Sequence, residues 1–196
     1  MNFDVSGFYR KASNYISTKI VSKGSKDQYQ YYNEPGVNLY GLEMEVKYGY
    51  KDLLQLSANG TYDKAINNKK YTDETNSQVS LTYKDQLPNR PWLYGNVNMT
   101  LSKQNLLGRD TRIELTWLFQ YVHWYYLSWE GLGIKQSKDF IPSQTVHSAI
   151  LGYSWKKDKY NVSFEVRNLT NELCYDNFRL QKPDRAFYVK YRMSIF

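Results

Sequence analysis

Alternation of apolar and polar residues with a period of two is the feature that most limits what this chain can fold into. From Tyr160 to Arg167, apolar residues at every second position alternate with polar ones. A β-strand directs successive side chains to opposite faces of a sheet, so this pattern predicts a strand with one apolar and one polar face. The same alternation recurs along most of the chain, and it predicts an all-β protein.

Eight segments carry this alternation, and we predict that they form an antiparallel up-and-down sheet. Their apolar positions fall within residues 3–9, 42–50, 54–62, 93–101, 113–121, 149–155, 160–166 and 187–195. Between the first two segments the pattern loosens. There, residues 24–27 predict a loop, and Glu34-Pro35-Gly36 predicts a turn.

The predicted connections alternate between short and long. The short ones are Lys51-Asp52, the region after Ser102, and Lys156 to Lys159. The long ones are Lys64 to Pro91, Leu127 to Ser143, and Leu169 to Asp184. Bacterial outer-membrane barrels have this asymmetry, with short periplasmic turns and long extracellular loops. The rhythm therefore favours a membrane barrel over a sandwich with mixed loop lengths.

The two faces of the predicted sheet differ in charge. The apolar face carries Leu, Val, Met and Tyr, whereas charged residues gather on the other, at Glu43, Glu45, Lys47, Glu114, Glu165 and Arg167. In a membrane barrel the charged face lines the lumen, because Lys or Arg facing lipid at the midplane costs about 2–4 kcal/mol. In a soluble sandwich the apolar face turns inward instead. Periodicity alone fits both arrangements.

Composition narrows the classes of function. The 20 Tyr and 5 Trp suit either the aromatic girdles of a membrane barrel or an aromatic-rich soluble binding domain. The net charge of +7 is spread along the chain without a basic cluster, so no nucleic-acid partner is expected. No run of about twenty apolar residues predicts a transmembrane helix.

No residues suggest catalysis or metal binding. Cys174 is the single cysteine, which excludes an internal disulfide and a multi-cysteine metal cluster. His123 and His147 are each isolated in the sequence, without the converging ligands that a metal or acid–base site needs. We therefore expect no enzyme activity, no cofactor and no metal.

One aromatic segment is the best candidate for ligand contact. It contains Trp124, Tyr125, Tyr126 and Trp129, within the second long connection. Aromatic residues on exposed loops often mark recognition surfaces. The alternative is that these rings belong to an interfacial girdle that anchors the rim of a barrel.

Several motifs resemble a known family. They are Gly41-x-Glu43-x-Glu45, the segment Ile141 to Gln144, and the run from Asn168 to Arg185, which contains Asn-Leu-Thr-Asn, Tyr-Asp-Asn-Phe and Gln-Lys-Pro-Asp-Arg. The chain then ends on Phe196. Together these features resemble the C-terminal part of the β-barrel of TonB-dependent outer-membrane receptors.

This resemblance implies a fold and a location. The eight strands would be part of a larger transmembrane β-barrel, surrounded by lipid of the bacterial outer membrane. Residues 1–196 would form a C-terminal barrel segment with the plug domain absent. The start, Met1 to Val5, lacks the features of a signal peptide, so we expect a piece of a longer receptor.

The resemblance also implies a function and partners. The receptor would import a scarce nutrient, an iron chelate or a vitamin-like small molecule, driven by the TonB energy-coupling system through the missing plug. The barrel-assembly machinery would read the last strand, at Phe187, Val189, Tyr191, Met193 and Phe196. Its apolar positions are one residue out of step with Phe196, which a terminal bulge would correct. Two alternatives remain, a soluble all-β ligand-binding domain and a complete small outer-membrane barrel.

Overall fold

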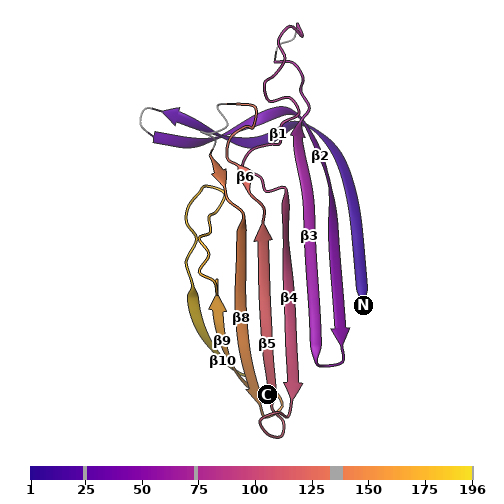
Figure 1. Cartoon of the computed structure of the whole chain (residues 1–196), viewed down its shortest axis with the longest axis vertical. Coiled ribbons are helices and arrows are strands. Elements are labelled where there is room, and N and C mark those ends of the chain that lie inside the picture. Colours follow the sequence, from indigo (N-terminus) through magenta and orange to yellow (C-terminus); the bar gives the residue numbers. More distant parts are fainter. Residues whose placement is uncertain (24–25, 73–74, 133–138, 196) are drawn as a thin grey trace.

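The structure is a computed structural model that describes residues 1–23, 26–72, 75–132 and 139–195. These residues form one antiparallel sheet of eight strands and a separate pair of two-residue strands (Figure 1). In the sheet the strand order is β1-β2-β3-β4-β5-β8-β9-β10, so each strand pairs with its neighbour in sequence. The predicted all-β, up-and-down sheet of eight strands is confirmed.

The strand bounds follow the alternating segments of the sequence. In the sheet they are β1 Asn2–Lys23, β2 Lys26–Tyr50, β3 Leu54–Asn67, β4 Leu93–Gln104, β5 Arg112–Val122, β8 Gln144–Trp155, β9 Tyr160–Arg167 and β10 Ala186–Met193. The short pair is β6 Tyr125–Tyr126 and β7 Phe140–Ile141. None of the described residues forms a helix long and apolar enough to cross a membrane.

The connections separate by length onto two ends of the sheet. The turns after β2, β4 and β8 are short and lie at the lower end in Figure 1, whereas the connections after β3, β5 and β9 are long and lie at the upper end. We call these the short-turn end and the long-loop end. The arrangement agrees with the predicted asymmetry, so the short-turn end corresponds to the periplasmic side of a barrel.

The first hairpin differs from the prediction. Residues 11–23 and 26–36 do not form a loose loop and a turn but extend β1 and β2, with pairing that continues to Lys23 and Lys26. The ladder is interrupted only where Asn14, with a φ of 53°, lies opposite Pro35. Proline has no N–H to donate, and a left-handed residue bends the strand. The Pro-Gly signal therefore marks a bend, beyond which the hairpin crosses the long-loop end (Figure 1). Residues 24 and 25 of the predicted loop lie outside the described residues.

The sheet leaves its apolar face uncovered. One row of cross-strand neighbours on this face runs from Leu115 through Leu151 and Phe164 to Val189, and these side chains are 45–74% exposed. A soluble sandwich would pack such a row against a second sheet. Exposed apolar rows are instead what a barrel presents to lipid.

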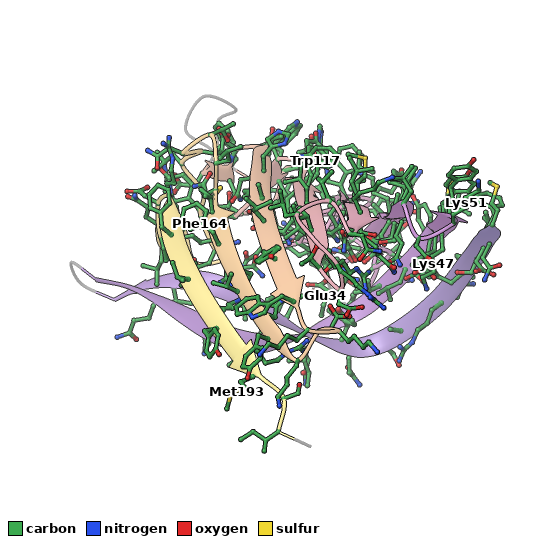
Figure 2. All side chains as sticks on the ribbon, turned by 90° about the horizontal axis from the view of Figure 1, so that it is seen from below. Glu34, Lys47, Lys51, Trp117, Phe164 and Met193 are labelled. Atoms are coloured by element: carbon green, nitrogen blue, oxygen red, sulfur yellow. The ribbon has the colours of Figure 1, made fainter. Side chains whose placement is uncertain are left out.

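The polar face is the concave one. A hollow of about 600 Å³ is lined by Ser57 of β3 and Glu165 of β9 together with polar residues of the strands between them. Strands that far apart in the sheet can line one hollow only if the sheet curves around it. Figure 2 shows this curvature, with Trp117 on the convex side. The charged face is therefore the inner face, as expected for a lumen.

Two small apolar clusters stabilise the long-loop end. The first contains Val37, Leu39, Ala65 and Leu87, with Trp129 packed against it. The second contains Tyr125, Leu127 and Ile141 and fastens β6 to β7. Both join loops to strands, so the loops form a structured rim.

The sheet is open among the described residues. β1 and β10 form its two edges and do not pair with each other. The alternative of a complete eight-stranded barrel is therefore not what these residues form. Eight strands of a larger barrel, as predicted, fit this open, curved sheet.

The last strand lies at one of these edges. Phe187, Val189, Tyr191 and Met193 all lie on its outward, apolar face, opposite Val166, Phe164, Val162 and Tyr160 of β9. Phe196 lies outside the described residues, so the terminal bulge remains a prediction. The role of this strand in barrel insertion remains a prediction.

Candidate functional site

A pocket on the inner face, near the long-loop end, is the best-formed candidate for a ligand site. It has a volume of about 390 Å³, within the range of small-molecule sites. Strands β4, β5, β8, β9 and β10 supply its wall, and the connection between β9 and β10 lies across it. Its polar lining includes Asn96, Gln120, Gln144, Arg167, Lys182 and Tyr188.

Buried amide groups hold the β9–β10 connection over this pocket. The Asn168 side chain accepts a hydrogen bond from the Glu172 backbone N–H and donates one to the Glu172 carbonyl, both 2.8 Å long. The Gln144 side chain accepts a hydrogen bond of 2.9 Å from the Tyr175 backbone N–H. Farther along, the Lys182 N–H donates to the Cys174 carbonyl at 2.8 Å. Motif residues identified in the sequence thus shape the pocket.

The charged residues that line the pocket are Arg167, Lys182 and Asp184, and Arg167 belongs to an ion-pair network beside it. The buried carboxylate of Glu165 accepts hydrogen bonds from Arg167 Nε at 2.5 Å and from Lys190 Nζ at 2.6 Å. The Arg167 guanidinium also lies over the Tyr188 ring, 4.7 Å from its centroid. Two cations therefore face the one Glu165 carboxylate and leave an excess of one positive charge, whereas Lys182 and the Asp184 carboxylate, which both line the pocket, offset each other. This balance suits an anionic or strongly polar ligand.

The Cys174 thiol, which also lines this pocket, is not poised for nucleophilic chemistry. Its side chain is buried, and burial raises the pKa of the thiol, with the Glu172 carboxylate adding to the rise. A thiolate is the reactive form, so a raised pKa disfavours reaction. Among the described residues, no group of three or more His, Cys, Asp or Glu side chains is placed to hold a metal ion.

The predicted ligand-contact residues divide between two environments. Tyr125 is buried, and its hydroxyl donates a hydrogen bond of 3.0 Å to Asn177 Oδ1. Trp129 packs against the inner apolar cluster around Val37. Trp124 is exposed and contacts the Tyr126 ring edge-on, with centroids 5.2 Å apart. Trp124, Tyr125 and Tyr126 nevertheless line one hollow of about 220 Å³, which Trp129 does not line, and the role of the four residues in ligand contact remains a prediction.

Trp124 and Tyr126 continue a chain of aromatic rings along the long-loop end. Trp92 contacts Tyr62 at 5.8 Å and His123 at 4.5 Å between ring centroids, and His123 contacts Trp124 at 5.7 Å. The Lys64 ammonium lies 4.3 Å from the centre of the Trp92 ring. Because Tyr62 belongs to the outward face, this row of aromatic rings has the position of an interfacial girdle.

The pocket itself was not identified from the sequence. Its polar residues come from five strands and one loop, and only the strand register brings them together. The available signal was weaker: Asn96, Gln120 and Arg167 lie on the predicted polar face, near the strand ends that lead into long connections. That signal could have indicated the end of the sheet but not the pocket.

Comparisons with known proteins agree with this geometry. The family model described as TonB dependent receptor-like, beta-barrel, matches residues 1–169. The match thus covers most of the chain but ends before most of the C-terminal motif region. A search of curated proteins found no match.

A solved structure with a similar fold is a mutant of the ferric enterobactin receptor from Pseudomonas aeruginosa, in complex with enterobactin. It matches with a TM-score of 0.61 and 18% sequence identity over 95% of this chain. The chain spans only 28% of the length of that receptor. A family of outer-membrane receptors, not of enzymes, accounts for the outward apolar face and the polar concave face. The chain belongs to the TonB-dependent receptor β-barrel family and is located in the bacterial outer membrane.

Proposed function

We propose that this chain forms the C-terminal wall of the barrel in a TonB-dependent receptor that imports an iron chelate. The observation that carries the proposal is the polar pocket on the inner face at the long-loop end, in a chain of this family. A ligand arriving from outside would pass the rim and then meet this pocket. The structural neighbour, titled a ferric enterobactin receptor, supports an iron chelate as the class of ligand.

The chemistry of the pocket suits such a ligand. Arg167 and Lys182 supply positive charge for an anionic chelate, and Asn96, Gln120 and Gln144 supply amide donors and acceptors. All of these groups except Lys182, which lies in the β9–β10 connection, project from strands, which hold them more rigidly than loops would. Trp124 and Tyr126 would make contacts at the rim before the ligand reaches the pocket.

Energy and assembly would come from partners of the whole receptor. Residues 1–196 would all belong to the barrel, and a plug domain elsewhere in the receptor would respond to TonB. Release of the ligand would then follow movement of that plug. The barrel-assembly machinery would recognise β10 during insertion.

Binding of ferric enterobactin to the intact receptor in outer-membrane vesicles tests this proposal. Lys182→Gln removes one exposed cation from the pocket. We expect the dissociation constant to rise about fivefold, equivalent to a loss of about 1 kcal/mol in binding free energy. Lys70→Gln is the matched control, since Lys70 is exposed at the same end but does not line the pocket. Iron-limited growth on the chelate should require both the receptor and TonB. Absence of binding, or equal losses in the two variants, would contradict the proposal.

A further inference from the structure

The opposite end of the sheet carries a hollow that the proposed import function does not use. It has a volume of about 550 Å³ and lies between the β4–β5 turn and the β8–β9 turn. Its lining includes Leu107, Arg109, Tyr153, Trp155, Lys156 and Val162. Tyr153 and Val162 are cross-strand neighbours on the outward face, so the hollow opens towards lipid at the short-turn end.

This hollow is apolar on one side and cationic on the other. Its aromatic wall is a stack in which Tyr153 and Trp155 lie 5.6 Å apart, and Trp155 and Tyr160 lie 5.4 Å apart. Above it, the ammonium groups of Lys156 and Lys159 lie 5.5 and 5.9 Å from the centre of the Tyr160 ring. Leu107 is 66% exposed, although it is large and apolar.

A backbone hydrogen bond joins the two turns, and Arg109 of one turn and Lys156 of the other line the same hollow. The Lys157 backbone N–H donates a hydrogen bond of 3.3 Å to the Asp110 carbonyl. The Asp158 carboxylate accepts a hydrogen bond from Ser154 Oγ, which draws that negative charge towards the inner face. Among the described residues, Asp110 is the one acidic residue that lines the hollow, against Arg109 and Lys156. The hollow therefore carries net positive charge.

The backbone of the β8–β9 turn indicates that its side chains matter. Lys156, Lys157 and Asp158 have φ values of 51°, 54° and 63°, three consecutive residues in the left-handed region. Glycine or asparagine adopts this conformation at lower cost than lysine. Strained backbone often accompanies functional sites. Two lysines at these positions place positive charge at the edge of the aromatic stack.

We propose that this hollow binds an anionic phospholipid of the periplasmic leaflet, with its phosphate between Arg109 and Lys156. The acyl chains would lie along Leu107, Val162 and the outward face of β8 and β9. Charge complementarity and continuity with the lipid-facing surface are the grounds for this choice. An arginine and a lysine that converge above an apolar wall match a phosphate attached to hydrocarbon.

Native mass spectrometry of the intact receptor tests the site. In detergent titrated with phosphatidylglycerol or phosphatidylethanolamine, we expect about tenfold stronger retention of one phosphatidylglycerol molecule. Arg109→Gln with Lys156→Gln should reduce that retention at least fivefold. The matched control is Lys51→Gln with Lys103→Gln, which removes two cations at the same end but outside the hollow. A heat-dependent gel shift checks that every variant is folded.

Three results would overturn the proposal. Equal retention of the two lipids would show that the headgroup charge is not recognised. Equal losses in the double variant and its control would show diffuse attraction instead of a site. Displacement of the lipid by millimolar inorganic phosphate would show an anion site without lipid specificity. Loss of chelate binding is not expected in any of these variants, so failure here is distinct from failure of the proposed function.

Discussion

Arg90 connects three separate segments at the long-loop end. Its Nη1 donates a hydrogen bond of 2.7 Å to the Tyr15 hydroxyl, and its Nε donates one of 3.2 Å to Asp63 Oδ2. Asp63 is 6% exposed, so removal of Arg90 would leave a buried carboxylate without its partner. We expect Arg90→Gln to destabilise the protein by about 2 kcal/mol, less than for a fully buried pair because Arg90 is partly exposed.

A heat-unfolding series in detergent measures this effect. Arg179→Gln is the control, because Arg179 pairs with Asp139 at 2.6 Å while both side chains are more than half exposed. An exposed pair contributes at most about 1 kcal/mol, so this variant should unfold close to the parent midpoint. If the two variants unfold at the same temperature, Arg90 does not have the anchoring role assigned here.

Tyr125 should make the long-loop end sensitive to alkali. Burial raises the pKa of its hydroxyl to about 12, and the Asp176 carboxylate adds to the rise. The pKa of an unfolded tyrosine is about 10, so this hydroxyl favours the folded state fully below pH 10. That contribution is lost as the pH rises from about 10 to about 12.

Heat-unfolding midpoints from pH 9 to pH 12 test this sign. The midpoint should fall over the upper part of the range, and Tyr125→Phe should fall less steeply. Some slope will remain in the variant, because burial also raises the pKa of Tyr32 to about 12. Parallel curves for the variant and the parent would contradict the assignment.

At the scale of single residues, the sequence predicted the kind of residue and the face it lies on better than the contacts it makes. The aromatic run from Trp124 to Trp129 was recognised, but its division between a buried core and an exposed rim depends on which loops pack against it. Arg167 was placed on the polar face, yet its contact with Tyr188 requires the register between β9 and β10. Such contacts are long-range, and period-two patterning carries no information about them.

At the scale of elements, two paired glycines mark a place where neighbouring strands approach closely. Gly60 and Gly95 are register partners on β3 and β4. A Cβ at Gly95 would lie 2.5 Å from the Asn59 carbonyl oxygen, whereas one at Gly60 would meet nothing within 4 Å. We expect Gly95→Ala to cost about 1–3 kcal/mol, since backbone must move to accept the methyl group.

The folded fraction recovered in outer membranes, read from the heat-dependent gel shift, measures this difference. Gly60→Ala should be recovered at the parent level, because its site has space for a methyl group. The two variants have the same chemistry and the same change in chain entropy. Equal recovery would mean that the local strand separation at Gly95 is wider than the structure gives.

Most strands could be predicted from the alternation of apolar and polar residues. The outer part of the first hairpin, formed by β1 and β2, could not, and its structure shows why. The cleanest runs, such as Leu42 to Tyr50, have one apolar face in lipid and one polar face in the lumen. Beyond Asn14 and Pro35 the hairpin bends across the long-loop end, so its two faces need not divide between lipid and lumen. Patterning disappears there although the strand continues. For this reason Pro35 was interpreted as part of a turn, although it marks a bend within a continuous strand.

At the scale of the whole molecule, the outward face has a depth profile that a soluble sheet would lack. Met99 lies mid-strand between Leu56 and Trp117, whereas Ile113 lies near the short-turn end, beside Tyr153 of the aromatic stack. Both side chains are half-buried. Packing alone therefore predicts similar costs for a charged substitution at either position, and only a surrounding bilayer makes them different.

Substitution by arginine at three sites separates these possibilities. In lipid, Met99→Arg should cost about 2–4 kcal/mol and Ile113→Arg about 1 kcal/mol or less, because the penalty falls from the midplane to the interface. Asn98→Arg is the control, since Asn98 is exposed on the polar face and its substituent would remain in the lumen. Folding equilibria in bilayers of defined thickness measure all three. Equal costs at Met99 and Ile113 would contradict a membrane-spanning outward face, whereas a cost at Met99 that grows in thicker bilayers would follow from a row of side chains held at the bilayer centre.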